Sequence, residues 1–304
     1  MAPLLQVNRL TKKFSETQAV AGISFAIEEG RCTALLGPNG AGKTTTIRML
    51  TGLLQPSEGE MIFDGVPQGQ SPRALLGYLP QSPAFYGWMT GREFVVYAGQ
   101  LCGLSAQEAK KYGNELLERV GLANAATRKI AGFSGGMKQR LGLAQALIHR
   151  PKLLVMDEPV SALDPVGRRE VLELLQELKR ETTILFSTHV LHDAEELCDD
   201  VIIIRGGEIA LQGAISDIRE NYRKPVITLY TEQDERSQKW CKAYATANVQ
   251  HVQEIQNGLQ ITVTDMEHSR RELLQQLYAE QISVTRLECG HSTLEELFMK
   301  VVSQ

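Results

Sequence analysis

The segment GPNGAGKT, Gly37 to Thr44, constrains the fold of this chain more than any other part of its sequence. It has the spacing G-x-x-x-x-G-K-T of a phosphate-binding loop. The apolar run CTALL precedes it and TTTIRMLTGLL follows it, which predicts a strand, a loop and a helix in that order. A chance glycine turn would lack this context. The segment therefore predicts a nucleotide triphosphate site in an α/β domain.

The residues of this loop have distinct predicted roles. Glycines allow the backbone to wrap phosphate oxygens, and the N-terminus of the following helix adds positive potential. Lys43 adds a full charge, and the hydroxyl of Thr44 is a ligand for Mg²⁺. The predicted nucleotide-binding residues here are Gly37, Pro38, Asn39, Gly40, Ala41, Gly42, Lys43, Thr44 and Thr45.

Further apolar runs indicate the rest of the sheet. They alternate with amphipathic stretches, a pattern typical of a mainly parallel sheet with helices on both faces. Between Gln81 and Arg150 the pattern is helical without strong strands, so we expect a helical subdomain at about 82–150. The runs are Leu153–Met156, Thr183–Ser187 and Val201–Arg205, and the inserted helices are Phe94–Leu101, Ala106–Val120 and Met137–His149.

The pattern changes again near residue 217. We expect an ATPase-type α/β domain at 1–216, a linker at 217–224 and a second domain at 225–304. The polar stretch SDIRENYRKP, which ends at Pro225, is typical of a helix end and a linker. The second domain has the order β-α-β-β-α-β with Asn257-Gly258 as a hairpin turn, which predicts a small α+β ferredoxin-like fold. Its closing helix has one apolar face, formed by Leu294, Leu297, Phe298, Val301 and Val302.

Two adjacent carboxylates, Asp157 and Glu158, end the apolar run LLVMDE. Burying them is costly unless they have a partner or a catalytic role. Asp157 is placed to hold Mg²⁺, and Glu158 is then the candidate that polarises an attacking water. The alternative is that neighbouring helix termini satisfy both carboxylates.

Composition excludes several classes of protein. The 304 residues carry a net charge of -4, without the strongly basic face that nucleic-acid binding requires. Five scattered cysteines lack a C-x-x-C pair, so neither a disulfide framework nor a zinc site is expected. We expect no export signal at the N-terminus, and no apolar run reaches the roughly 20 residues that cross a bilayer. A membrane partner would have to supply the span.

Six motifs together resemble one family. They are GPNGAGKTT, Gln81 in YLPQ, FSGGMKQR at 133–140, LLVMDE at 153–158, SALD at 161–164 and STHV around His189. Their order and approximate spacing are similar to those of ABC transporter ATP-binding subunits, over roughly the first 215 residues. The C-terminal region, ending in STLEELFMKVV, resembles the accessory domain of subunits that pair with a separate exporter permease.

The resemblance implies ATP and Mg²⁺ as ligands and a head-to-tail dimer, either a homodimer or a pair with a related ATPase subunit. Ser134, Gly135 and Gly136 would touch the γ-phosphate held by the partner. Gln81 would sense Mg²⁺ and the lytic water, His189 would contact the γ-phosphate, and Asp164 would communicate across the dimer. In the segment FSGGMKQR, Phe133 and Met137 depart from the commonest signature sequence of the family, LSGGQ. Both residues lie at the edge of the signature and affect how that edge contacts the nucleotide and the partner subunit.

Aromatic residues have open alternatives. Phe14 is similar in position to the residue that stacks on adenine, and equally an isolated Phe near a strand can belong to the core. Phe85, Tyr86 and Trp88 lie where the family receives a short helix of the membrane subunit, or they pack the helical subdomain.

The resemblance therefore implies a transport ATPase with an integral-membrane permease as partner and no nucleic acid. We expect it in the cytoplasm, peripheral on the inner face of the cell membrane, driving export of a drug-like, peptide or lipid substrate. An importer is the alternative within transport. A repair or translation ATPase of the same family is less favoured, because the chain has neither a long coiled-coil insertion nor a second ATPase domain.

Overall fold

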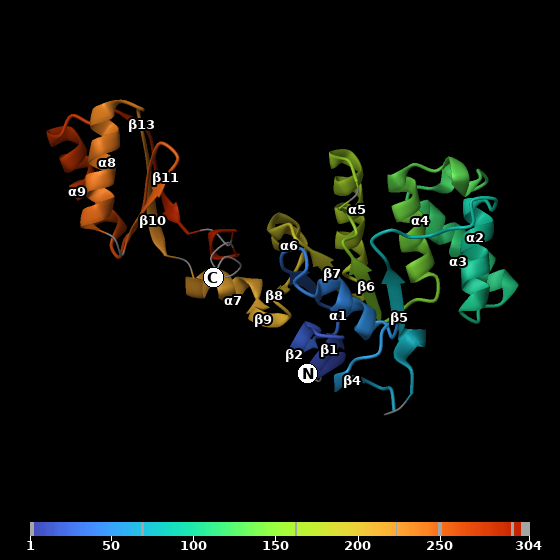
Figure 1. Ribbon diagram of the computed structural model, residues 1–304. Helices are drawn as coiled ribbons and strands as arrows, with labels where there is room; N and C mark the ends of the chain where they lie inside the picture. Colours follow the sequence, from blue (N-terminus) through green and yellow to red (C-terminus); the bar gives the residue numbers. More distant parts are fainter. Residues whose placement is uncertain are drawn as a thin grey trace. The chain divides into compact units, whose positions relative to one another are not determined.

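The computed structural model describes residues 3–67, 70–161, 163–222, 224–248, 251–292 and 295–298. The chain divides into two compact units, Met1–Ile215 and Ser216–Gln304. The elements of both are labelled in Figure 1.

Six strands form the central sheet of the first unit, in the order β5-β6-β7-β3-β8-β9. The first five run parallel and β9 is antiparallel to β8. The carboxyl ends of the parallel strands therefore meet at one edge, where open α/β sheets bind ligands. The strands are β3 (Cys32–Leu36), β5 (Leu76–Leu79), β6 (Leu153–Asp157), β7 (Thr183–Thr188), β8 (Asp200–Arg205) and β9 (Glu208–Ala214).

Both faces of this sheet are covered. Every residue of β3, β6 and β7 is buried, as expected for parallel strands between two layers. Leu35, Val155 and Leu185 on one face pack with α1 and a three-stranded antiparallel sheet, β2-β1-β4. On the other side, α6 contacts β3 and β7 and packs against α5. These elements are β1 (Leu5–Phe14), β2 (Thr17–Ile27), β4 (Glu58–Phe63), α1 (Lys43–Leu50), α5 (Pro165–Leu178) and α6 (Leu191–Leu197).

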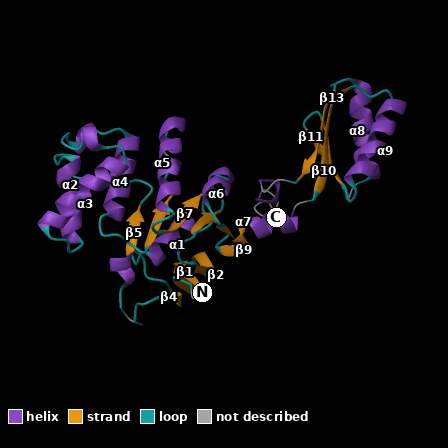
Figure 2. Cartoon of the chain, turned by 180° about the vertical axis from the view of Figure 1, so that it is seen from behind, coloured by secondary structure: helices purple, strands orange, loops and turns teal. Residues whose placement is uncertain are grey.

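Three helices between β5 and β6 gather beside β5, as both views show (Figures 1 and 2). Each begins at a residue whose side chain caps it. Thr90 Oγ1 accepts from the N–H of Glu93, and Glu93 Oε2 accepts from the N–H of Thr90, which is a capping box. The helices are α2 (Gly91–Leu101), α3 (Ala106–Arg119) and α4 (Gly135–Leu147), with short 3₁₀ turns at Pro72–Leu75, Ala123–Ala125 and Ile130–Gly132.

The second unit is a four-stranded antiparallel sheet in the order β11-β12-β10-β13 with two helices on one face (Figures 1 and 2). Its core joins Ile227, Leu229 and Leu259 of the sheet to Leu273 and Leu277 of α9. The elements are β10 (Pro225–Thr231), α8 (Glu235–Ala247), β11 (Val252–Ile255), β12 (Gly258–Thr262), α9 (Met266–Ala279) and β13 (Val284–His291).

The predicted fold class is confirmed: an α/β P-loop domain with antiparallel strands and a helical subdomain, followed by a ferredoxin-like α+β domain. Of the predicted closing helix, Leu297 and Phe298 lie in the helical segment 295–298. Leu294, Val301 and Val302 lie outside the described residues.

The polar stretch between the two predicted domains includes helix α7 (Ile215–Tyr222), because no Gly or Pro interrupts it and Ile215 and Ile218 provide a buried i, i+3 pair. One local prediction needs correction. In the hairpin, Asn257 takes the left-handed conformation, with φ 66°, and Gly258 already belongs to β12 opposite Ile255. Gly258 is needed there for space, since a Cβ would lie 1.8 Å from the carbonyl oxygen of Leu229.

Among the helices of the described residues, none combines the length and apolar character needed to cross a membrane.

We predict that Gly258→Ala lowers the free energy of unfolding of the second unit by about 1–3 kcal/mol, because the added methyl meets backbone that cannot move without breaking the sheet. The matched control is Gly290→Ala in β13, where a Cβ has no heavy atom within 4 Å. Urea unfolding followed by Trp240 fluorescence, in a Trp88→Phe background, measures both. Equal midpoints for the two variants would contradict the packing argument.

Candidate active site

The phosphate-binding loop leaves β3 at Leu36 and enters α1 at Lys43. Two glycines give it its path. A Cβ on Gly37 would lie 2.3 Å from the carbonyl oxygen of Ile204, and one on Gly42, at φ 109°, would lie 2.6 Å from that of Ala19. The first N–H groups of a helix have no acceptor within it, so the N-terminus of α1 attracts an anion.

The other loop residues are placed around this turn. Ala41 belongs to the hydrophobic core, and its carbonyl accepts from the N–H of Gly207 at 3.0 Å. Asn39 and Gly40 are exposed at the tip, while Pro38 and Thr45 are half-buried. Ala41 therefore anchors the loop in the core, while Asn39 and Gly40 are exposed to solvent.

Lys43 is almost fully buried, at 6% exposed, and its ammonium bends over its own loop. Nζ donates to the carbonyl oxygens of Gly37 at 2.8 Å and Pro38 at 3.1 Å. Burial lowers the pKa of Lys43, while the carboxylates of Glu158 and Asp157 act in the opposite direction. When a nucleotide binds, its phosphate oxygens can replace the two carbonyl oxygens as partners of the Lys43 ammonium.

Hydroxyl and carboxylate oxygens lie close together beside the loop, around Asp157, the last residue of β6. Its Oδ1 accepts from Thr44 Oγ1 at 3.2 Å and from Ser187 Oγ at 2.7 Å. Hydroxyl and carboxylate oxygens are the donors that Mg²⁺ prefers, and it usually keeps only one or two protein ligands besides phosphate and water. The residues present therefore fit a Mg²⁺ ion held by Thr44 and Asp157.

Glu158 joins three neighbouring strand ends. Its Oε2 accepts from Gln81 Nε2 at 3.1 Å, beyond β5, and its Oε1 lies 3.2 Å from His189 Nδ1, beyond β7. The same Oε1 is 3.8 Å from Lys43 Nζ. The structure thus gathers Gln81, Glu158 and His189, which lie far apart in the sequence, next to the phosphate loop.

Among the described residues, the hydrogen-bond and ion-pair partners of the Asp157 and Glu158 carboxylates are side chains. Glu158 also has φ 47°, a conformation that a non-glycine residue rarely adopts. Such strain is typical of functional sites.

The signature residues begin α4, away from this cluster. Ser134 Oγ accepts from the N–H of Met137 at 3.2 Å and so caps the helix, and Gly136 faces Leu163. Within the described residues, no hydrogen bond or ion pair joins Ser134, Gly135 or Gly136 to the phosphate loop. Asp164 caps α5, accepting from the N–H of Gly167 at 2.7 Å.

Phe14 ends β1 and is 47% exposed, with Lys12 Nζ 5.2 Å from the centre of its ring. The alternative that it belongs to the core is therefore wrong. Its face is available for stacking, although no contact of the chain assigns it that role.

Sequence reasoning missed Ser187. Its hydroxyl accepts from the N–H of Glu158 at 2.9 Å while it donates to Asp157. The only signal was a polar residue in the apolar run ILFST, two positions before His189.

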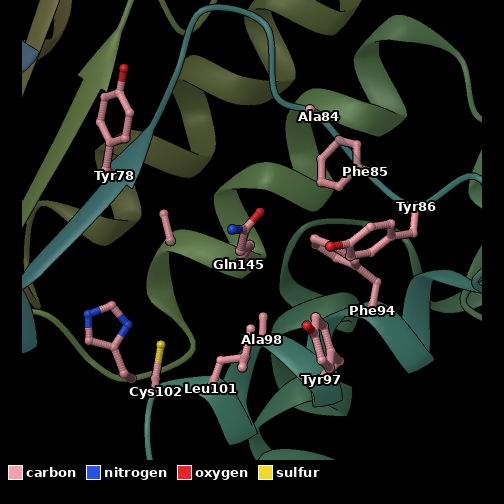
Figure 3. Close-up of a pocket in the computed structure, with 12 residues that line it drawn as sticks. Tyr78, Ala84, Phe85, Tyr86, Phe94, Tyr97, Ala98, Leu101, Cys102 and Gln145 are labelled. Atoms are coloured by element: carbon pink, nitrogen blue, oxygen red, sulfur yellow. The ribbon is translucent and has the colours of Figure 1, made fainter. Parts of the chain in front are cut away.

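A second feature is a cavity of about 590 Å³ in the helical subdomain. Figure 3 shows Phe85, Tyr86, Phe94 and Tyr97 gathered at one end of it. Phe85 packs edge-on against Phe94 at 4.9 Å, whereas Tyr86 is 52% exposed. One part of this aromatic cluster is therefore packed, and another part is exposed. Trp88, at 71% exposed, lies next to Tyr86.

Two family models match separate parts of this chain. The family model described as ABC transporter matches residues 20–161. The model described as the C-terminal domain of ATP-binding protein DrrA1-3-like proteins matches residues 213–302.

Several curated proteins are similar to this chain. An uncharacterized ABC transporter ATP-binding protein of Bacillus subtilis, YxlF, is 46% identical over 98% of this chain and 99% of its own length. The linearmycin resistance ATP-binding protein LnrL of the same organism is 34% identical over 99% of each chain. The Nod factor export ATP-binding protein I of Burkholderia lata is 41% identical over 70% of this chain and 71% of its own.

Solved structures are similar to a large part of this chain. An ATP-binding subunit of an ABC transporter has a TM-score of 0.65 and 33% identity, covering 72% of this chain and 93% of its own. A dimeric ATP-binding cassette in a post-hydrolysis state, bound to ADP and Pi, has a TM-score of 0.63 and 25% identity, covering 69% and 98%.

We predict that Lys43→Met weakens ATP affinity by about 10- to 100-fold, the loss of one charge-assisted contact to phosphate. Lys110→Met, which removes an exposed ammonium on α3, is the control and should leave affinity unchanged. Titration calorimetry with ATP measures both. Equal affinities in the two variants would remove Lys43 from the binding site.

Proposed function

This chain belongs to the ABC transporter family of ATP-binding proteins and is an ATPase, and we propose that it drives export through a separate membrane permease. One observation carries the proposed hydrolytic site: Gln81, Glu158 and His189 meet beside Lys43 at the carboxyl edge of the sheet. Export is supported by the relative named for Nod factor export.

In the proposed site, the loop binds the phosphates of ATP. Lys43 and the N-terminus of α1 supply positive charge, and Phe14 stacks on the adenine. Thr44 and Asp157 hold Mg²⁺, with Gln81 beside them. When bound, Mg²⁺ neutralises charge on the phosphate oxygens and orients them.

Glu158 is the proposed base. Its carboxylate orients a water whose oxygen attacks the γ-phosphorus, and it accepts the proton as the bond to the β–γ bridging oxygen breaks, giving ADP and phosphate. His189 Nδ1 and Gln81 Nε2 hold that carboxylate in place from both sides. His189 also contacts the γ-phosphate.

We place the second half of the site on another chain. Ser134, Gly135 and Gly136 of one subunit cap the ATP held by its partner in a head-to-tail dimer, and Asp164 connects the two sites. Support comes from the helix-starting position of Ser134, which offers N–H groups to an anion, and from the dimeric cassette bound to ADP and Pi. A homodimer would have two complete sites; a related ATPase subunit could replace one copy.

The aromatic cavity of the helical subdomain is the proposed contact with the permease. Its exposed rings, Tyr86 and Tyr97, can contact the apolar face of a short amphipathic helix that binds in the cavity. This contact would hold the protein on the cytoplasmic, inner face of the cell membrane.

Glu158→Gln should lower kcat by about 10²- to 10⁴-fold, because the amide cannot accept the proton, while ATP binding is kept. ATP should then trap a closed dimer, measured by light scattering. Glu177→Gln, an exposed change on α5, is the control. Unchanged turnover in Glu158→Gln would remove this residue from the role of base.

Tyr86→Ala with Tyr97→Ala should release the protein from a multi-helix membrane protein that crosslinking and mass spectrometry identify in membranes carrying the wild type. ATP affinity should be unchanged, because the groove is separate from the phosphate loop. Tyr278→Ala, which removes an 87% exposed ring of α9, is the control. Recovery of the wild type only with ribosomes or DNA would contradict the transport proposal.

A further inference from the structure

Ser187 lies in β7 directly opposite Asp157 of β6 and is fully buried, at 0% exposed. We propose that Ser187 is a positioning residue that fixes the metal-binding carboxylate and the catalytic base through one hydroxyl. The inference rests on the proposed roles of Asp157 and Glu158.

The directions of its two hydrogen bonds follow from chemistry. An amide N–H can only donate, so Ser187 Oγ accepts from Glu158 N at 2.9 Å. The single hydroxyl proton is then free to go to Asp157 Oδ1, at 2.7 Å. One oxygen atom therefore connects the backbone of Glu158 to the side chain of Asp157.

The bond to Glu158 acts on an unfavourable backbone conformation. With φ 47°, Glu158 turns its side chain out of the strand direction, toward Gln81 and His189. Such a conformation persists only where the surroundings over-determine it. Ser187 holds the residue at its amide, and the two other side chains hold it at its carboxylate.

The bond to Asp157 acts on the metal ligand. Oδ1 is shared between Ser187, at 2.7 Å, and Thr44, at 3.2 Å, so the shorter bond comes from the residue that is not a proposed ligand. Because a hydrogen bond to a carboxylate is strong in a buried site, it orients the group toward Thr44. Outer partners of this kind typically contribute about 10- to 100-fold in metal affinity or activity.

Ser187→Ala removes the oxygen and adds no atom, so it tests the proposal without steric conflict. We expect kcat per folded enzyme to fall by about 10- to 100-fold, or the half-saturating Mg²⁺ concentration to rise by a similar factor, or both. The KM for ATP should stay within about twofold, because Lys43 and the loop are untouched. Folded enzyme is counted by thermal melting and ATP binding.

Thr33→Val is the matched control. Thr33 lies on the neighbouring strand β3 and is 1% exposed, and its hydroxyl has no hydrogen-bond partner among the described residues. Removing that hydroxyl should change kcat and Mg²⁺ dependence by less than about twofold. If Ser187→Ala does not fold, Ser187→Cys, whose thiol is a weak donor and acceptor, is assayed against the same limits.

The proposal is overturned if kcat and Mg²⁺ dependence of Ser187→Ala both match those of Thr33→Val, or if KM for ATP rises in step with the loss of kcat. Glu158→Gln and Asp157→Asn are assayed in parallel. Full turnover in those two would overturn the proposed site itself and this inference with it. Full turnover in Ser187→Ala alone overturns only the inference.

Discussion

Burying the ammonium of Lys43 at the edge of a parallel sheet depends on the charges that surround it. Desolvation disfavours the charged form, and Glu158 and Asp157 favour it. Neither carboxylate could be buried at the end of β6 without partners of its own, which come from Thr44, Ser187, Gln81 and His189. The polar groups of the site therefore depend on one another, and the ends of β3, β5, β6 and β7 each supply at least one.

The parallel sheet makes this set possible. Because β5, β6, β7 and β3 are consecutive neighbours, the residues that follow them meet at one edge although they lie up to 152 positions apart, from Gly37 to His189. The buried strands are mainly apolar before they reach that edge. In β7, the hydroxyl of Ser187 connects Glu158 and Asp157 at the end of β6.

Whether a feature of the fold or the site could be predicted depends on how far apart in the sequence its interacting residues lie. The strand, loop and helix around Gly37 depend on local spacing, so sequence alone identified them, as it did the β-α-β-β-α-β order of the second unit. The extent of helix α7 was not predicted, because its polar composition hides the pair Ile215 and Ile218. Ser187 was missed because its bond to Asp157 joins strands 30 residues apart and depends on register. Asn257 and Gly258 were both assigned to the turn, whereas Gly258 belongs to β12 and is needed there because of Leu229, on another strand.

In the proposed function, the loop after β5 connects chemistry to transport. Gln81 donates to Glu158, and four residues later Phe85 packs on Phe94 in the wall of the aromatic cavity. A displacement of the cavity wall therefore reaches the carboxylate through a short stretch that includes Pro83, which restricts its backbone. On the other side, Ser187 holds the backbone of Glu158 in the sheet. Movement of the helical subdomain would thus break or make the Gln81 contact and change how the carboxylate is held, while the backbone of the base stays bonded to Ser187, so that the permease could control turnover without dismantling the site.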